Sequence, residues 1–208
     1  EAVINKHGHM PLPPYIGRSD EPMDRERYQT VYARKPGSIA APTAGLHFTK
    51  DLLTRLQEHG VRRVAVTLHV GVGTFRPVAV DDPAEHELHE EHYHISKEAA
   101  DAINTSIMAG RRIWAIGTTV VRTLESAVEE GGLVRPGSGT TQLFIRPSFN
   151  FQIVNCLLTN FHLPRSTLLM LVAAFAGYGN TMAAYQQAIA FGYRFYSYGD
   201  AMAVVDHH

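Results

Sequence analysis

The 208-residue sequence lacks the features of several special classes of protein. It contains one cysteine, Cys156, which cannot form an internal disulfide, so we expect a reducing, cytoplasmic compartment. The longest apolar run, residues 168–176, is far shorter than the roughly 20 residues that cross a bilayer. The first residues show no basic start followed by an apolar stretch, so the sequence predicts neither a signal peptide nor a membrane partner.

A strong charge of one sign is also missing. Nineteen Lys and Arg residues stand against 20 Asp and Glu residues, for a net charge of −1, and 45% of the residues are hydrophobic. This composition excludes a disordered or collagen-like chain. The length is typical of one domain, or of one large and one small domain, with a real core. A basic groove for nucleic acid stays open as a prediction, because a neutral total can hide one.

Familiar catalytic motifs are absent as well. The sequence has no Walker motif and no Gly-x-Gly-x-x-Gly, which argues against nucleotide sites of those two kinds. It has no Gly-x-Ser-x-Gly elbow, and Cys156 lies in an apolar run, so it offers little support for nucleophilic hydrolase chemistry.

What the sequence does contain is an alternation of strand and helix patterns. Residues 1–20 read as an extended, proline-rich segment, followed by a mixed-charge stretch that leads into a short helix over 28–32. Periodicity predicts longer helices and short strands, separated by a long loop over 131–139. The expected helix caps are Thr49, Ser96 and either Ser166 or Thr167. The alternation predicts an α/β layered domain. We expect helices over 50–59, 96–109, 118–128, 167–175 and 181–191, and strands over 63–70, 112–116, 141–145 and 151–158.

Two glycine-containing clusters follow predicted strands. Gly71, Gly73 and Thr74 come directly after the strand that ends at Val70, where glycine lets the backbone approach a ligand closely. The alternative is an ordinary tight turn. Residues 117–119 lie between a strand and a helix, where free N–H groups and the helix dipole favour an anion.

The turn over residues 117–119 has its own alternatives. Thr118 or Thr119 could simply cap the helix. Arg122 and Glu125, one turn deeper, could reach the same opening or form an ordinary surface ion pair.

Residues 86–94 hold four histidines and three glutamates. A metal is one interpretation, but His86 and His89 are three apart, as are His89 and His92, whereas the zincin pattern needs a spacing of four. The competing interpretations are that Glu91 or a nearby histidine is a positioned base, or that the segment is a solvated acidic face.

Two further polar segments follow apolar elements. Asn160 and His162 lie between a predicted strand and an apolar helix, where they could present hydrogen-bond donors to a ligand or satisfy a buried loop. Residues 193–200 are rich in tyrosine and include Tyr198 and Asp200; they could stack on a base or pack in the core.

Taken in order, these blocks closely resemble one family, the S-adenosylmethionine:tRNA ribosyltransferase-isomerases of queuosine biosynthesis. The resemblance runs through nearly the whole chain, and several blocks in order are far more specific than any one of them. The blocks are residues 8–16, 28–33, 41–49, 69–75, 86–91, 117–126, 159–164, 166–170 and 193–202.

The resemblance implies a reaction and its partners. A bacterial, cytoplasmic enzyme of this family transfers and isomerises the ribosyl part of S-adenosylmethionine onto 7-aminomethyl-7-deazaguanine at the tRNA wobble position. Adenine and methionine leave, and the product is epoxyqueuosine. The cosubstrate's own sulfonium acidifies the adjacent C5′ hydrogens, so no metal is expected. The protein supplies a base for C5′, an acid for departing adenine, and groups that hold the substrates.

The resemblance also suggests roles for individual residues. The acid and base candidates are His47, His69, Glu91 and His162. The candidates for substrate binding are Thr43, Gly45, Gly71, Gly73, Thr74, Gly117, Thr118, Thr119, Arg122, Asn160, Tyr198 and Asp200.

The sequence departs from the family in two residues and in length. The family usually has glycine where Ser148 stands and aspartate where Asn155 stands. The resemblance implies a mixed α/β sheet with flanking helices, the barrel-like main domain of the family. We expect the chain to be the C-terminal part of that domain over 1–208, with an extended segment over 1–36. The N-terminal strands and an inserted small β-barrel would be absent.

Two alternatives to an active enzyme stay open at this point. One is a fragment that binds tRNA or S-adenosylmethionine without turnover. The other is a metal-dependent hydrolase that uses the histidines of residues 86–94.

Overall fold

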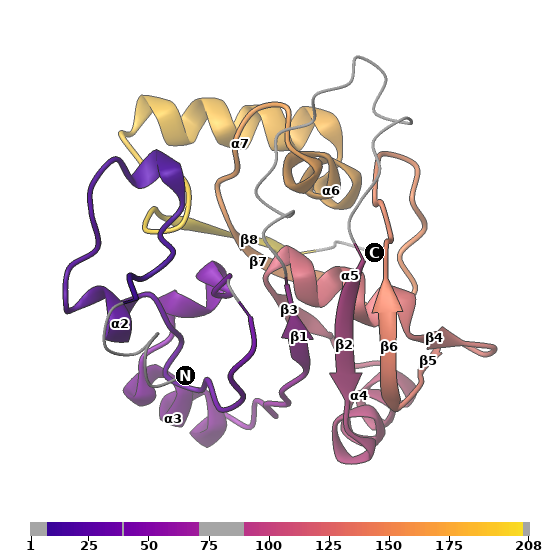
Figure 1. Ribbon diagram of the computed structural model, residues 1–208. Coiled ribbons are helices and arrows are strands. Elements are labelled where there is room, and N and C mark those ends of the chain that lie inside the picture. The colour runs from indigo at the N-terminus through magenta and orange to yellow at the C-terminus, as the bar shows by residue number, and fades with distance from the viewer. Residues whose placement is uncertain (1–7, 39, 71–89, 206–208) are drawn as a thin grey trace.

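The computed structural model describes residues 8–38, 40–70 and 90–205, which form three small sheets and six α-helices (Figure 1). This mixed α/β architecture confirms the predicted fold class. The described strands close no barrel: two sheets have three strands each, and the third is a two-stranded hairpin.

The N-terminal part contains short helical elements and one regular helix. These are η1 (Pro14–Ile16), α2 (Asp24–Arg27), η2 (Thr43–His47) and α3 (Lys50–Glu58). Thr49 caps α3 as predicted, since its side chain accepts a hydrogen bond from Leu52 N at 3.1 Å. The helix predicted over 28–32 is wrong: α2 ends at Arg27, and its C-cap Tyr28 has left the helical conformation, with φ of −88° and ψ of 35°.

Asp24 connects the two ends of the chain. Its carboxylate accepts two hydrogen bonds from Arg18, at 2.6 and 2.9 Å, and one from Glu21 N. Tyr198 Oη donates to the same carboxylate at 2.8 Å, across 174 residues. The Arg18 guanidinium holds the pKa of the Asp24 carboxyl well below its usual range. These bonds fix the N-terminal segment against the tyrosine-rich segment near the C-terminus.

The first sheet is antiparallel, with strand order β1 (Thr67–His69), β2 (Glu91–Ile95) and β6 (Gly137–Thr141). The strand predicted over 63–70 pairs only from residue 67 onward, and Val64 is exposed. The loop predicted over 131–139 and the strand over 141–145 are also wrong. Gly139 pairs with Tyr93, and a Cβ at Gly139 would lie 2.6 Å from the Tyr93 hydroxyl, so the glycine-rich segment forms a strand under that ring.

The second sheet has β7 (Cys156–Asn160) at its centre, parallel to β3 (Trp114–Ile116) and antiparallel to β8 (Ala201–Val205). The strand predicted over 151–158 begins only at Cys156. Residues 152–154 donate their backbone N–H groups to the Glu125 carboxylate and so do not join a ladder. Strand β8 was not predicted. A hairpin of β4 (Val128–Glu129) and β5 (Leu133–Val134) makes the third sheet.

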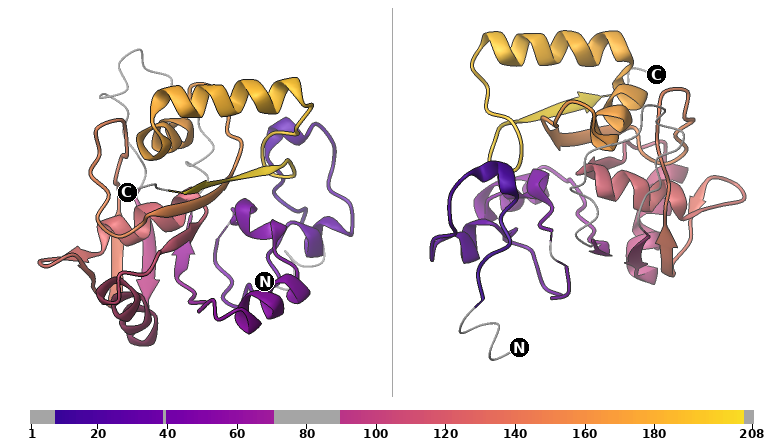
Figure 2. Two further views of the ribbon diagram at one scale, coloured as in Figure 1. Left: turned by 180° about the vertical axis from the view of Figure 1, so that it is seen from behind. Right: turned by 45° about the horizontal axis from the view of Figure 1, so that its top comes forward.

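Four helices pack around these sheets. They are α4 (Lys97–Met108), α5 (Thr118–Ser126), α6 (Thr167–Ala176) and α7 (Tyr178–Ala190). Ser96 caps α4 and Ser166 caps α6, as predicted. Figures 1 and 2 show α6 and α7 on the side of β7 and β8 opposite α4. No single described helix is long and apolar enough to cross a membrane; α6 and α7, bent by 114°, pass that test only as a pair and only by length and composition.

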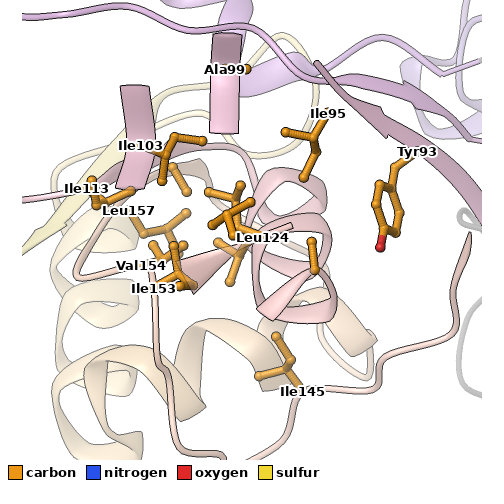
Figure 3. Close-up of a cluster of buried hydrophobic side chains, with 14 of the residues drawn as sticks. Tyr93, Ile95, Ala99, Ile103, Ile113, Leu124, Ile145, Ile153, Val154 and Leu157 are labelled. Carbon is orange, nitrogen blue, oxygen red and sulfur yellow. The ribbon is translucent and has the colours of Figure 1, made fainter. Parts of the chain in front are cut away.

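The main hydrophobic core lies between the first two sheets and helices α4 and α5. Ile95, Val121 and Leu157 are fully buried, and Figure 3 shows labelled members of this cluster converging from strands and helices. Truncating such a side chain typically costs about 2–5 kcal/mol. A smaller cluster of Phe161, Tyr185 and Ala188 joins β7 to α7. Strand β7 therefore packs against both clusters: Leu157 belongs to the main core, and Phe161, just after the strand, belongs to the smaller one.

Candidate active site

The site begins where two parallel strands end together. Ile116 of β3 is paired with Leu158 of β7, so the residues that follow both strands leave the sheet at one edge. Gly117 N continues the pairing by donating to Leu158 O at 2.8 Å. In open α/β sheets this carboxyl edge is where ligands bind. The predicted clusters at residues 117–119 and 160–162 are thus brought together.

Element η2 crosses this edge from a distant part of the chain. A Cβ on Gly117 would lie 3.9 Å from the Ala44 Cβ, and His47 Nε2 lies 3.3 Å from Asn160 Nδ2. Gly45 has a packing reason to be glycine, because a Cβ there would collide with Tyr32 and Thr30. The structure therefore brings the predicted residues Thr43, Gly45 and His47 to the same edge as the predicted Asn160.

Asn160 is almost fully buried at this edge, with 2% exposure. Its Nδ2 approaches His47 Nε2 and also the backbone carbonyl of Asp200, at 3.5 Å. Its Oδ1 is buried and has no hydrogen-bond partner within the part of the chain that the structure describes. A buried carbonyl left without a donor costs about 1–3 kcal/mol, so a hydrogen-bond donor that reached this atom would be favoured.

His162 lies two residues further on and is held at both ends. Its Nε2 is 2.8 Å from Thr159 Oγ1, and its backbone N–H donates to Tyr185 Oη at 2.8 Å. Burial lowers the pKa of the His162 imidazole to about 4, so the ring is neutral at neutral pH. A neutral ring of fixed orientation can accept a proton or a hydrogen bond from a substrate.

Helix α5 starts at this edge without a side-chain cap. Its N-cap residue is Gly117, with φ of 97°, and among the described residues no side chain caps its first N–H groups. The helices α3, α4 and α6 each have a Ser or Thr cap, whereas α7 also begins at a glycine, Gly177, without a side-chain cap. The first turn of α5 therefore presents Thr118 and Thr119 with the positive end of the helix dipole, which favours an anionic ligand group.

Arg122 and Glu91 form a buried ion pair one turn deeper. Their exposures are 4% and 2%, and Arg122 Nη2 donates to Glu91 Oε2. Burial lowers the pKa of the Arg122 guanidinium, and the Glu91 charge opposes that shift. Arg122 Nε has no partner among the described residues. The Arg122 charge, which the sequence suggested for a ligand carboxylate, is thus already paired with Glu91.

Other predicted residues lie elsewhere. Tyr198 donates its hydroxyl to Asp24, and burial together with this bond raises its pKa to about 12. The Asp200 carboxylate accepts from Arg194 N at 2.7 Å, so only its backbone carbonyl faces Asn160. His69 ends β1, where a Cβ on Gly37 would lie 2.9 Å from its ring. Gly71, Gly73 and Thr74 lie outside the described residues.

The histidine-rich segment does not assemble a metal site within the described residues. Residues 91–95 form a strand, so His92 and His94 share one face while Glu91 points into the interior. His94 Nδ1 lies 2.9 Å from Ser138 Oγ. No group of three or more potential ligands occurs in residues 8–38, 40–70 and 90–205. His86 and His89 lie outside this part.

The sequence analysis did not identify two residues that shape the site. Thr159 and Tyr185 orient His162. Thr159 lies in a polar block that the sequence analysis noted, but its contact with His162 depends on the turn after β7. Glu125 was considered for the site and instead accepts three backbone N–H groups at the other end of β7.

Comparisons with known proteins identify the family of this chain. The family model described as "Queuosine biosynthesis protein" matches residues 1–204. A crystal structure of an S-adenosylmethionine tRNA ribosyltransferase from Thermotoga maritima is similar, with a TM-score of 0.66 and 46% sequence identity. The similarity covers 78% of this chain and 51% of that chain, so this chain spans about half of that relative. The resemblance seen in the sequence motifs is confirmed: the chain belongs to the family of queuosine biosynthesis proteins.

Proposed function

We propose that this chain carries active-site residues of a cytoplasmic S-adenosylmethionine:tRNA ribosyltransferase-isomerase. The reaction moves the ribosyl part of S-adenosylmethionine onto 7-aminomethyl-7-deazaguanine in tRNA, isomerises it, and releases adenine and methionine. Membership of the queuosine biosynthesis family and the named activity of the Thermotoga relative support this proposal.

The observation that carries the proposal is the gathering of unlike polar groups at one sheet edge. An uncapped helix N-terminus, a neutral histidine and a buried amide meet where β3 and β7 end. The N-terminus of α5 suits the methionine carboxylate of the cosubstrate, because its N–H groups and dipole attract an anion. The cosubstrate's other polar groups then face Asn160, His47 and His162.

The acid and base candidates differ in what the fold lets them do. His162 is neutral at neutral pH, which is the form that can take a proton from C5′. His47 is exposed and can donate a proton toward departing adenine. Glu91 is joined to Arg122 in the interior and suits a supporting charge better than direct proton transfer. His69 stays a candidate at the end of β1.

Adenine release tests the proposal. We expect the chain to release adenine from S-adenosylmethionine when tRNA carrying 7-aminomethyl-7-deazaguanine is present, as followed by chromatography. His162→Gln should lower the rate at least about 100-fold, the size of a typical general acid–base contribution. His92→Gln is the matched control, because His92 is exposed on the outer face of β2 and should leave the rate unchanged.

The Thermotoga relative serves as the positive control for substrates and detection. If that enzyme releases adenine and this chain, folded and with both substrates, releases none, the proposed activity does not reside in this chain. If His92→Gln and not His162→Gln abolishes release, the histidine-rich segment and not the sheet edge holds the chemistry.

A further inference from the structure

We propose that Asn160 binds the nucleoside part of the cosubstrate through its amide oxygen and fixes the tautomer of His47 through its amide nitrogen. Its Oδ1 accepts a hydrogen bond from an N–H or O–H group of the ligand. Its Nδ2 holds His47 with the ring proton on Nδ1. The inference rests on the proposed function and adds the atoms that recognise the cosubstrate.

The orientation of the Asn160 amide follows from its second neighbour. Nδ2 lies 3.5 Å from the Asp200 backbone carbonyl, which can only accept a hydrogen bond. The reversed amide would place two acceptor oxygens against each other, so the nitrogen must face Asp200. The same nitrogen lies 3.3 Å from His47 Nε2.

This orientation determines what His47 offers. An amide N–H needs an acceptor, so His47 Nε2 must be unprotonated, and a neutral ring then carries its proton on Nδ1. His47 is exposed, so that Nδ1–H is accessible to a ligand. Asn160 is therefore a positioning residue for a histidine that donates.

The other end of the amide is open. Asn160 Oδ1 is buried in a residue with 2% exposure and has no partner among the described residues. Asn155, just before the same strand, shows the contrast: its Oδ1 accepts from Ile113 N at 2.7 Å. An unmatched buried acceptor beside an uncapped helix N-terminus indicates a ligand donor that completes it.

The nucleoside part of S-adenosylmethionine carries two kinds of hydrogen-bond donor, the exocyclic amine of adenine and the ribose hydroxyls. Either would satisfy Oδ1 by the same chemistry. The two sources are separated by ligands that lack one donor at a time.

Calorimetric titration tests the acceptor. The probes are S-adenosylhomocysteine, its deaminated form S-inosylhomocysteine, and its 2′-deoxy and 3′-deoxy forms. We expect one of the altered ligands to bind the wild-type chain about 10-fold more weakly, the loss of one good hydrogen bond. In Asn160→Leu, which keeps the branched shape of the side chain but removes the acceptor, that difference should vanish.

Thermal unfolding without ligand separates a binding role from a structural one. Asn160→Leu removes the unmatched acceptor together with the two long Nδ2 contacts at 3.3 and 3.5 Å, so the two effects oppose each other and its melting temperature should stay close to that of the wild type. A melting temperature lowered by several degrees would instead show that the amide supports the fold.

Nitrogen-15 NMR of the His47 ring tests the tautomer without any ligand. At mildly alkaline pH, we expect the proton of the His47 ring on Nδ1 in the wild type. Asn160→Asp presents only acceptor oxygens, so the proton should move to Nε2. Asn155→Asp is the matched control: it keeps the acceptor that Ile113 N uses and should leave His47 unchanged.

The outcomes separate this inference from the proposed function. A folded wild-type chain that binds no S-adenosylhomocysteine contradicts both. Binding with equal affinity for all four probes overturns the Asn160 inference and leaves the proposed function standing. A His47 proton on Nε2 in the wild type also overturns the inference.

Discussion

The two ends of strand β7 use polar side chains in opposite ways. At the amino end, the Glu125 carboxylate accepts from the backbone N–H groups of residues 152, 153 and 154 at 2.9, 3.1 and 2.9 Å. Asn155 there accepts from Ile113 N. At the carboxyl end, Asn160 Oδ1 has no partner among the described residues, and α5 begins without a side-chain cap.

We infer from this difference that the amino end of β7 stabilises the fold and that the carboxyl end is the candidate site. Glu125 and Asn155 satisfy backbone groups that would otherwise be buried and unpaired, so they belong to the stability of the sheet. An unpartnered acceptor and a helix terminus without a side-chain cap cost stability, which a bound ligand would offset.

The largest expected effect comes from removing the Glu125 carboxylate at the amino end of β7. Glu125→Ala removes the acceptor of three backbone N–H groups, each bond to a charged group contributing about 1.5–3 kcal/mol. We expect the free energy of unfolding to fall by about 4.5 kcal/mol or more, measured by urea denaturation. Since a typical domain has only about 5–15 kcal/mol, Glu125→Gln, which keeps a neutral acceptor, serves as the milder variant.

Exposed Glu129 provides the control, because Glu129→Ala removes the same carboxylate from the surface hairpin. Its effect should stay within about 0.5 kcal/mol. If Glu125→Ala is as mild as Glu129→Ala, the contrast between the two ends of β7 fails.

The pH dependence of stability tests the role of His162 at the carboxyl end of β7. The pKa of His162 falls from 6.5 to about 4 on folding, so between these values the unfolded chain binds more protons than the folded chain. The free energy of unfolding therefore decreases as pH falls from 6.5 toward 4, and His162 adds no further loss below that. His162→Gln should flatten this part of the profile, measured by urea unfolding across the range.

Exposed His92 again provides the comparison, since His92→Gln should keep the wild-type slope. Equal slopes in the wild type and in His162→Gln would mean that the His162 ring is hydrated in the folded chain, and its neutral role would lose its basis.

The smallest expected effect lies in the turn after the core residue Ile145. Ser148 has φ of 80°, a left-handed conformation that favours glycine. Relief of this strain outweighs the greater freedom of glycine in the unfolded chain, so Ser148→Gly should stabilise by about 0.5 kcal/mol. Thermal unfolding beside Ser148→Ala, which loses only the hydroxyl, checks the sign. A lower melting temperature for the glycine variant would contradict it.

The helices show how far local sequence determines the fold. Thr49, Ser96 and Ser166 cap α3, α4 and α6 as predicted, because a cap acts on an N–H group three residues away. The predicted strands were less accurate, since β6 and β8 exist through their partners β2 and β7. A strand's bounds depend on pairing, which short-range periodicity does not contain.

The candidate site shows the same division. The sequence alone identified His47, Asn160, His162 and the turn at residues 117–119, and its ordered motifs identified the family. It could not show that Arg122 is already engaged by Glu91, or that Tyr198 serves Asp24.

By itself, the sequence determined the capped helices, the family and most of the polar residues at the site. Only the tertiary structure decided which of these residues meet and which polar atoms stay open. Asn160 meets His47 across 113 residues and Tyr198 meets Asp24 across 174. Such contacts depend on how β3 and β7 align and on what packs above them, and hydrogen-bond satisfaction is a property of that packed arrangement.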